Sequence, residues 1–565
     1  MTLFPIRNWI KTYTKDDFSG DLVAGIITAI LLVPQGMAFG ILAGLPAQVG
    51  LYASVLPPII YALFGTSRTL AVGPVSVAAI MVAQTLAGLP ETVSALDAAV
   101  IMAFLSGITL AVFGLLRFGS IANFMSHSVL LGFTNAAALL IIASQLPNLI
   151  GFQKPKTLSP DEYAIAIDQG ITANHGVTLA IGGVCIVFLL FASKGLIKVL
   201  TKMKFQERIA QLLSRCAPLF IVIAGAFLVS VGELKFVNVV GSIPGGLPQL
   251  KLNIPSIDII LQLLPASVLI ALVGYVESVS ISKTLANRHR QAIDTNQELL
   301  ALGAANFAGG LSGGMPVAGG FSRTMVNYAA GAKTQVASII TAMLVGIVAL
   351  FFTPLLENIP KAALAAIIIV AVSKLIDVKS ILRIWRYDVF DGVIILATTV
   401  SVLILGIEEG LGIGIALSFV TLALRAAKPH VAVMGRVRSS EHFRNINRHD
   451  VETWPNLLFL RVDENLTFAN AAFLESIAAN YLAKEENITD VILVLSSVNT
   501  IDSSALEVLE RMLESARELK VRFHLSDIKG PVMDKLEKSH LLELLNPGKV
   551  FLSAHQAAEE LKSSK

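Results

Sequence analysis

Charged residues are scarce in this sequence. Of its 565 residues, 15% are Asp, Glu, Lys or Arg, whereas soluble domains carry about 25%. Hydrophobic residues make up 54% of the chain. This deficit excludes an ordinary soluble enzyme and predicts a lipid bilayer as the surroundings. A formal net charge of +3 is too small to indicate a nucleic-acid partner.

Residues that build catalytic and metal sites are also few. The two cysteines, Cys185 and Cys216, lie in or beside apolar runs, so the sequence offers no disulfide framework and no CxxC metal site. The nine histidines are scattered, and neither HExxH nor GxSxG occurs. The glycine-rich stretch 303–320 lacks the GK[ST] ending of a phosphate-binding loop. We therefore expect no catalytic residues, no metal, no cofactor and no enzyme.

Long apolar runs are abundant instead. A helix needs about 20 mainly apolar residues to cross a bilayer, and such runs occur near 22–43, 49–64, 97–116, 124–146, 175–193, 217–232, 264–282, 294–310, 335–353, 360–376, 388–406 and 409–427. Two shorter apolar segments, 74–88 and 320–332, are interrupted by Gly and Pro. Together these segments predict an α-helical polytopic membrane protein of about fourteen segments, with a transmembrane domain over 22–427.

The basic residues indicate an orientation for these segments. Lys and Arg collect in the loops 194–215, 283–290 and 374–386, while 233–260 carries few of them. Because basic loops stay in the cytoplasm, we expect a multi-pass protein of the cell membrane with both termini cytoplasmic. The segment 1–21 is too polar for a signal peptide and suits either a short interfacial helix or a solvated leader.

The character of the chain changes after 427. Residues 428–456 are polar and basic and are expected to form a linker. From 457 to 565, apolar runs at 457–462, 491–495 and 521–525 alternate with helical stretches at 469–484 and 503–519. This alternation predicts a small α/β domain with a partly parallel sheet.

The two short, broken segments are the most informative feature for function. The first reads GTSRTLAVGPVSV at 65–77, and the second reads GGMPVAGGFSRT at 313–324. They occupy corresponding places in two halves of about seven segments each, which in inverted-repeat transporters indicates a midplane substrate site. A helix that begins inside the membrane directs free N–H groups and a positive dipole end at an anion. Simple kinks in packed helices remain an alternative, although the hydroxyls and the Arg in each segment favour a site.

Two ionisable residues within apolar surroundings add to this hypothesis. Arg323 follows Gly320 and must be paired or face a cavity. We interpret it as part of a positive field for an anion, with snorkelling to the membrane interface as the alternative. Glu277 lies in the run 268–281, which contains no basic residue. Low-dielectric surroundings favour its neutral form, so it is a candidate proton carrier. The alternative is a structural carboxylate permanently paired, for example with Arg323.

The sequence resembles the sulfate permease (SulP) family, close to its plant-type sulfate transporters. The resemblance is carried by GDLVAG at 20–25, VPQGMAF at 33–39, GLY at 50–52, FGTSR at 64–68, VGPV at 72–75, PVAGGFSR at 316–323, Asn327, and IPK at 359–361. It covers nearly the whole chain. It implies a seven-plus-seven inverted repeat split into core and gate domains, a C-terminal STAS domain over 457–565, and usually a homodimer.

The resemblance also implies roles for individual residues. Gln35 and Phe39 would line the anion site. Backbone N–H groups would come from the half-helix starts at Gly73, Pro74 and Val75 and at Phe321, Ser322 and Arg323. Glu277 matches the acidic position associated with proton symport. Val75 departs from the Phe of some animal exchangers, which leaves the preferred anion open.

In the STAS domain, the sequence IDSSA at 501–505 resembles the loop whose second hydroxyl is phosphorylated in anti-sigma-factor antagonists. Ser504 is therefore a candidate regulatory residue. Capping of the following helix by Asp502 or Ser503 is the simpler explanation of the same pattern, and we favour it.

These observations predict a secondary active transporter of inorganic anions, with sulfate:proton symport as the leading hypothesis. Sodium-dependent bicarbonate transport, dicarboxylate uptake and chloride–bicarbonate exchange are the alternatives within the family. A membrane sensor that signals through its STAS domain is the alternative from another class. The expected partners are an inorganic anion, a coupling proton or sodium ion, the lipid bilayer and a second copy of the chain.

Overall fold

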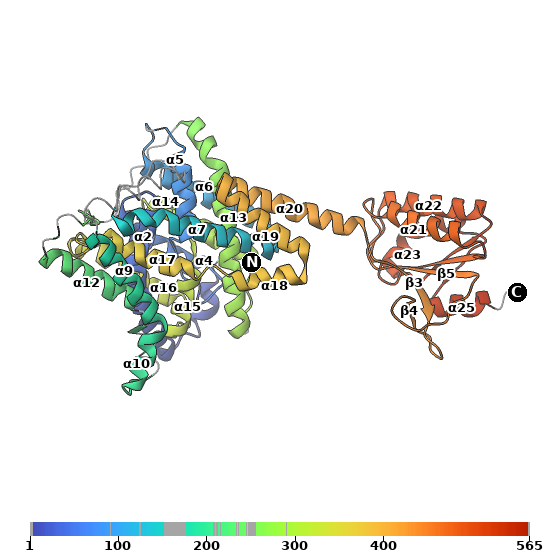
Figure 1. Cartoon of the computed structure of the whole chain (residues 1–565), viewed down its shortest axis with the longest axis horizontal. Helices are drawn as coiled ribbons and strands as arrows, with labels where there is room; N and C mark the ends of the chain where they lie inside the picture. Colours follow the sequence, from blue (N-terminus) through green and yellow to red (C-terminus); the bar gives the residue numbers. More distant parts are fainter. Residues whose placement is uncertain are drawn as a thin grey trace. The chain divides into compact units, whose positions relative to one another are not determined.

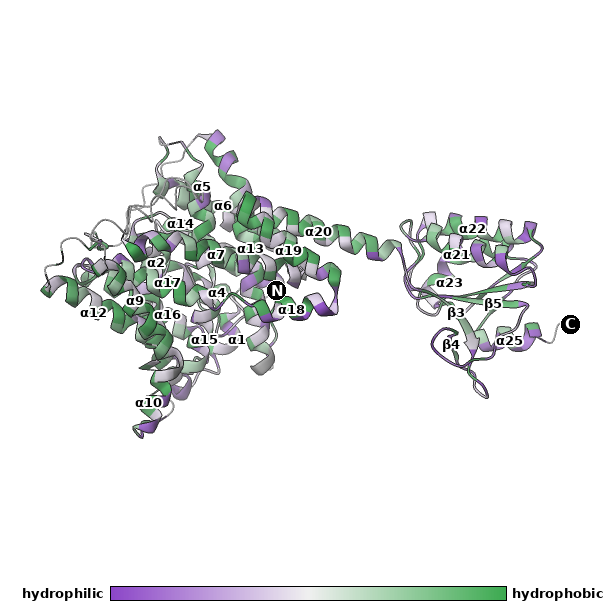
Figure 2. Cartoon of the chain, viewed as in Figure 1, coloured by the Kyte–Doolittle hydropathy of each residue, from purple (hydrophilic) through white to green (hydrophobic). Residues whose placement is uncertain are grey.

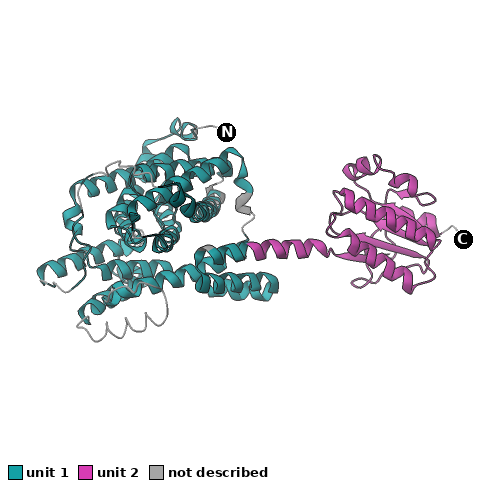
Figure 3. Ribbon diagram, turned by 90° about the horizontal axis from the view of Figure 1, so that it is seen from above, with its two compact units in different colours: residues 1–415 teal, residues 416–565 magenta. Residues whose placement is uncertain are grey.

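The structure of the protein is a computed structural model. It describes residues 4–90, 92–123, 126–151, 176–206, 210, 213–214, 216–232, 234, 237–243, 246, 256–289 and 291–562. The chain forms two compact units, residues 1–415 and 416–565 (Figure 3). The helix α20, Ile407–Ala427, begins in the first unit and ends in the second.

The first unit is built almost entirely from helices (Figure 1). Its N-terminal half contains α1 Ile6–Ile10, α2 Lys15–Leu42, α3 Ala47–Tyr52, α4 Leu56–Phe64, α5 Ser76–Ala87, α6 Ala95–Leu115, α7 His127–Ile150, α9 Gly176–Phe191, α10 Ile197–Lys202 and α12 Ala217–Val231. Its C-terminal half contains α13 Ile257–His289, α14 Thr295–Leu311, α15 Phe321–Ala330, α16 Val336–Phe351, α17 Lys361–Ser373, α18 Val378–Tyr387 and α19 Val389–Leu405.

The predicted fold class is confirmed. Each of the fourteen apolar segments coincides with a helix or, at α3–α4, with a pair of helices. Six of the described helical spans are long and apolar enough to cross a membrane. Shorter apolar helices, α5 among them, complete the set. Apolar residues dominate these helices (Figure 2). Among the loops used for orientation, residues 207–209, 211–212, 215 and 290 and most of 233–255 lie outside the described residues.

Small residues let the first helices approach closely. The helix α2 begins in a capping box, in which Thr14 and Asp17 satisfy each other's backbone N–H groups. Further along, Gly36 faces Gly50 of α3, where an added Cβ on Gly50 would lie 1.8 Å from the Gly36 carbonyl oxygen. Only glycine allows this contact, which is typical of helix packing in membranes. The segment before α2 contains α1, whose Trp9 is buried.

The second unit is an α/β domain around a six-stranded sheet. Its strands are β3 Val431–Arg436, β4 Phe443–Asn445, β5 Leu457–Val462, β6 Asp490–Val494, β7 Arg522–Ser526 and β8 Val550–Phe551, in the order β4-β3-β5-β6-β7-β8. The strands β5 to β8 are parallel to one another, while β3 is antiparallel to both of its neighbours. The helices are α21 Ala471–Lys484, α22 Ser503–Glu518, α23 Gly530–Leu536, α24 Leu541–Leu544 and α25 Ala554–Lys562.

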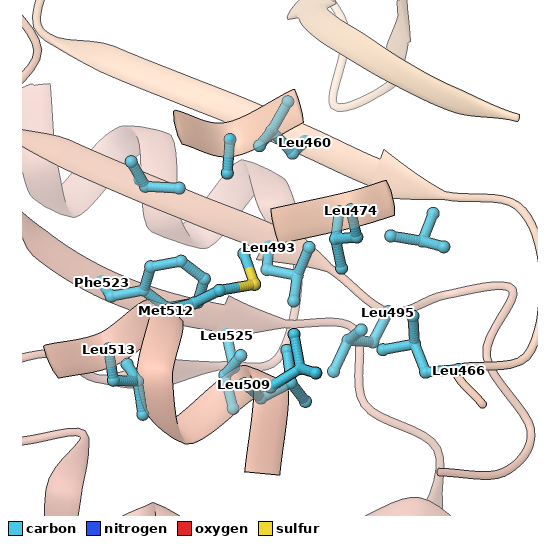
Figure 4. Close-up of a cluster of buried hydrophobic side chains, with 14 of the residues drawn as sticks. Leu460, Leu466, Leu474, Leu493, Leu495, Leu509, Met512, Leu513, Phe523 and Leu525 are labelled. Atoms are coloured by element: carbon cyan, nitrogen blue, oxygen red, sulfur yellow. The ribbon is translucent and has the colours of Figure 1, made fainter. Parts of the chain in front are cut away.

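A buried apolar cluster lies between this sheet and the helices α21 and α22. Leu460, Leu493 and Leu525 come from neighbouring strands and meet Leu474 of α21 and Leu509 of α22 (Figure 4). The predicted strands and helices of this domain are therefore present, and they share one hydrophobic core.

The segment 428–456 differs from the expected linker, because it contributes the strands β3 and β4 to the sheet. The reason is the alternation along β3, where Ala432 and Met434 are buried and their immediate neighbours Val431 and Val433 are partly exposed. In the sequence, the basic residues around this short alternation obscure it. The strand forms because it pairs with β5.

Candidate functional site

The two broken segments of the sequence meet in the fold. The short strand β1, Val72–Gly73, pairs antiparallel with β2, Ala318–Gly319, so that Val72 lies opposite Gly319 and Gly73 lies opposite Ala318. The helix α5 begins at Ser76 and α15 begins at Phe321, each within three residues of its strand. The pairing therefore brings the N-termini of two helices from opposite halves of the unit to one place.

Neither of these helix ends is capped by a side chain within the described residues. The N-cap residues are Val75 and Gly320, both extended, and neither carries a side-chain oxygen. The N–H groups of the first turn of each helix are thus left to another acceptor. Two uncapped, positive helix ends at one place are suited to an anion.

Arg323 joins the two segments. Its side chain is 2% exposed. Nε donates a hydrogen bond to the Ala71 carbonyl oxygen at 3.2 Å and Nη1 donates to the Pro74 carbonyl oxygen at 3.1 Å. Nη2 is buried and has no hydrogen-bond partner in the part of the chain that the structure describes.

The free nitrogen of Arg323 lies at the two helix ends. A Cβ added to Gly320, the N-cap of α15, would lie 3.1 Å from Nη2, and one added to Gly73 would lie 3.3 Å from it. Glycine at both positions therefore leaves space for the guanidinium group. A buried donor without a partner costs free energy of about 1–3 kcal/mol, so this nitrogen is a candidate ligand for a bound anion.

Polar side chains of α15 and the loop after it hold the first segment in place. Asn327 Nδ2 donates to the Thr69 carbonyl oxygen at 3.0 Å, and the Thr324 hydroxyl oxygen accepts from the Ala71 N–H at 3.0 Å. Gln335 Nε2 donates to the carbonyl oxygens of Ser67 and Leu70. Neither Thr324 nor Gln335 was predicted from the sequence to have a role. The feature of the sequence that could have identified them is a polar residue next to a broken apolar segment.

Glu277 lies on α13, which packs against β2, α5 and α15. Its neighbour Ser278 fixes this contact, because the Ser278 hydroxyl oxygen accepts a hydrogen bond from the Gly319 N–H at 2.8 Å. The Glu277 side chain accepts no hydrogen bond and forms no ion pair within 4.0 Å in the described chain, although Arg323 is close enough to interact with it electrostatically. A direct ion pair between the two is thus not formed in this structure.

The remaining predicted residues differ in their surroundings. Gly73, Pro74 and Val75 are buried, whereas Phe321 and Ser322 are exposed at the first turn of α15. Gln35 and Phe39 are buried one turn apart on α2, which packs against α5 and α15. Gln35 makes no side-chain hydrogen bond to any described residue. The structure joins Gly73 and Pro74 to Arg323 by direct contact, and it places Gln35 and Phe39 on an adjoining helix.

Two buried carboxylates that the sequence analysis missed tie the halves together. Glu298 of α14 accepts hydrogen bonds from the Tyr61 hydroxyl at 2.7 Å and from the Thr66 N–H at 2.7 Å. Asp21 of α2 accepts from the backbone N–H groups of Lys333 and Thr334. Both acids are 0% exposed. Glu298 lies in the first turn of α14, where an acid is common, and Asp21 follows Asp16 and Asp17 at the polar start of α2. Only the tertiary contacts therefore distinguish them.

Ser504 lies in the first turn of α22 in the second unit. Asp502 caps this helix, because its Oδ1 accepts from the Ala505 N–H at 2.8 Å, which agrees with the favoured explanation. Oδ2 of Asp502 also accepts from the Phe468 N–H at 2.8 Å. The Ser504 side chain is exposed, and its phosphorylation stays a prediction.

Comparison with protein families identifies the chain. The model of the sulfate permease family matches residues 18–398, and the STAS domain model matches residues 448–557. The chain belongs to the sulfate permease family. As a member of it, the protein is a multi-pass membrane protein of anion transport with a C-terminal STAS domain, and the resemblance noted from the sequence motifs is confirmed.

Relatives in this family include plant transporters. Sulfate transporter 4.1, chloroplastic, of Arabidopsis thaliana is 34% identical over 572 residues, which cover 99% of this chain and 82% of that protein. High affinity sulfate transporter 2 of Stylosanthes hamata is 31% identical, with 98% of this chain and 86% of that protein covered. These relatives are transporters, which agrees with the expectation that the protein is not an enzyme.

Solved structures of the same fold include the murine solute carrier 26 family member A9 anion transporter in the inward-facing state. It matches with a TM-score of 0.87 at 23% identity, over 100% of this chain and 94% of that chain. The transmembrane domain of a cyanobacterium bicarbonate transporter, BicA, matches with a TM-score of 0.60 at 23% identity, over 72% of this chain and 98% of that chain. At these identities the similarity concerns the fold.

Proposed function

We propose that this sulfate permease family member is a secondary active transporter that carries sulfate together with protons across the cell membrane. The observation that carries the proposal is the meeting of two uncapped helix N-termini at the β1–β2 pair, with Nη2 of Arg323 unpartnered beside them. We further propose that the protein works as a homodimer with both termini in the cytoplasm.

The chemistry of sulfate fits these donors. Sulfate is a doubly charged oxyanion whose oxygens accept several hydrogen bonds, and the first turns of α5 and α15 offer backbone N–H groups from two sides. Arg323 adds a charged donor that is held in place by the Ala71 and Pro74 carbonyl oxygens. Gln35 and Phe39 would complete the pocket from α2. The names of the plant relatives, all sulfate transporters, support this choice of anion.

The position of Glu277 supports the proposal of proton coupling. A divalent anion that enters a low-dielectric site needs compensating positive charge. Arg323 supplies one charge, and a proton on Glu277 would remove the opposing negative charge of the carboxylate. The absence of a hydrogen bond or ion pair to Glu277 among the described residues leaves that carboxylate able to change protonation state.

The proposal is tested by uptake of labelled sulfate into proteoliposomes at clamped membrane potential. Uptake is expected to rise as external pH falls, and Glu277→Gln is expected to flatten this dependence while anion binding is kept. The matched control is Asp258→Asn, which removes an exposed carboxylate in the first turn of the same helix. The control is expected to keep the wild-type pH profile.

Other outcomes decide between the remaining functions. If Glu277→Gln keeps the wild-type pH profile, the carboxylate is structural and Glu277 does not couple transport to protons. Uptake that requires sodium and is competed by bicarbonate would replace the proposal with bicarbonate transport. A protein that binds anions but carries none, with or without sodium, would be a sensor.

A further inference from the structure

The second unit contains a basic cavity of about 440 Å³. It lies where β3, β4 and β5 run side by side, within and beside the segment that the sequence analysis expected to be a linker. Three arginines and two histidines line it with one carboxylate and one amide: His430, Arg444, Asn445, Arg448, His449, Arg461 and Asp463. The cavity therefore has an excess of positive groups.

The pairing of β3 with β5 places one group of these residues. Val431 lies opposite Val462 and Ala432 lies opposite Arg461. The next pair outward is His430 with Asp463, where the Asp463 N–H donates to the His430 carbonyl oxygen at 3.0 Å. Asp463 Oδ2 contacts His430 Nδ1 at 2.7 Å and accepts from Arg461 Nη2 at 2.9 Å. The single carboxylate of the cavity is thus shared by Arg461 and His430.

A turn after β4 brings the other group to the cavity. The Arg448 and His449 N–H groups donate to the Asn445 carbonyl oxygen at 3.1 and 3.2 Å, and the Asn447 N–H donates to Asn445 Oδ1 at 2.8 Å. The side chains of Arg444 and Arg448 form no hydrogen bond and no ion pair with any residue that the structure describes. Two guanidinium groups at the cavity therefore have no protein anion to neutralise them.

We infer that this cavity is a binding site for a tetrahedral oxyanion, a phosphate or sulfate group. Guanidinium groups present paired N–H donors that match such anions, and charge-assisted hydrogen bonds of this type are strong. The cavity is larger than one tetrahedral ion, so it has room for a larger ester such as a lipid headgroup as well as for a free ion. The bound group is therefore either a free ion or the phosphate of such an ester. The site lies in the second unit, which contains the STAS domain and is called the STAS unit below, and it shares no residue with the proposed transport site.

The test uses the full-length protein in neutral detergent, in a Ser322→Phe background that places a bulky side chain in the first turn of α15 to weaken anion binding at the proposed transport site. Inorganic phosphate and inositol 1,4,5-trisphosphate are each titrated by isothermal calorimetry. We expect saturable binding at one site. Each lost charge-assisted hydrogen bond costs about tenfold in affinity, so the double variant Arg444→Gln/Arg448→Gln is expected to bind about 100-fold more weakly. Tighter binding of inositol trisphosphate would assign the site to a headgroup ester, and tighter binding of phosphate would assign it to a free ion.

The matched control is Arg438→Gln. Arg438 lies between β3 and β4, pairs with Asp450 at 3.9 Å and does not line the cavity. It is expected to keep the affinity. A second double variant, Arg444→Lys/Arg448→Lys, keeps the charge but loses the paired donors and is expected to bind with intermediate affinity. The inference is overturned if no oxyanion binds, if Arg444→Gln/Arg448→Gln leaves the affinity unchanged, or if Arg438→Gln weakens it equally.

Discussion

Two buried charges, Arg323 in the first unit (the membrane unit) and Asp490 in the second (the STAS unit), differ in how fully the protein satisfies their hydrogen-bonding groups. Asp490 is 0% exposed. It accepts hydrogen bonds from His524 Nε2 at 2.9 Å, from Arg522 and from the Thr489 hydroxyl at 2.7 Å. Arg323 uses two of its nitrogens on carbonyl oxygens and leaves Nη2 without a partner among the described residues. Two equally buried charges therefore have different surroundings.

This difference indicates different roles. The hydrogen bonds from His524 and Arg522 to Asp490 join β7 to β6, and His524 Nδ1 also accepts from the Lys549 N–H at 3.0 Å. A charge satisfied in this way stabilises the fold. A buried charge that keeps one donor unpaired at two uncapped helix ends is arranged for a ligand. Asp490 is therefore a structural charge, while the surroundings of Arg323 fit its proposed role in anion binding.

The largest expected effect is on the structural charge. Asp490→Ala leaves the buried His524 and the Arg522 guanidinium without their acceptor, and breaking such a pair costs about 3–5 kcal/mol of stability. Hydrogen exchange in the full-length protein is expected to show lost protection of β6 and β7, with anion binding in the membrane unit retained. Asp534→Ala, an exposed carboxylate on α23, is the control. Unchanged protection in Asp490→Ala would remove the structural role.

The next effect is on the binding charge. Arg323→Gln removes charge-assisted hydrogen bonds to two carbonyl oxygens and the free donor, so sulfate uptake is expected to fall about 100-fold. Hydrogen exchange in the STAS unit is expected to stay unchanged. Arg383→Gln, on the exposed surface of α18, is the matched control and should transport normally. If Arg323→Gln transports at the wild-type rate, the distinction between the two charges fails.

The smallest expected effect is a loss of stability of the STAS unit at low pH. Burial alone would raise the pKa of Asp490, but hydrogen bonds from His524, Arg522 and Thr489 lower it to about 2. An unfolded chain has an Asp pKa of about 4, so the carboxylate stabilises the fold above pH 4, and this contribution of about 2 kcal/mol is lost as pH falls from about 4 to about 2.

The measurement is the hydrogen-exchange protection of β6 and β7 in the full-length protein between pH 7 and pH 2. Asp490→Asn is expected to lower protection at pH 7 and to flatten its decline in acid, whereas Asp534→Asn should decline as the wild type does. A decline in Asp490→Asn as steep as in the wild type would assign the acid sensitivity to other carboxylates.

The sequence allowed the role of Arg323 to be predicted, but not that of Asp490. Arg323 was found because a charge beside a broken apolar segment is conspicuous. Asp490 was not, because an Asp at the start of a strand in a soluble domain is an ordinary residue. Glu298 was missed for the same reason, since acids in the first turn of a helix are common, and Asp21 was missed because it follows two other acids, Asp16 and Asp17. In each case the information lies in which donors surround the carboxylate, and those donors come from distant segments, as with Asp490 and His524.

By itself, the sequence determined the fourteen apolar segments, the two breaks at 65–77 and 313–324, the motifs of the family and the alternation of strands and helices after 457. Hydrophobic periodicity and Gly or Pro breaks act within a segment, so they are visible locally. Only the tertiary structure decided that β1 pairs with β2, that Arg323 rather than Ser322 is buried, and that 428–456 completes a sheet around a basic cavity. These features depend on hydrogen bonds and packing between segments up to 252 residues apart, which no local pattern specifies.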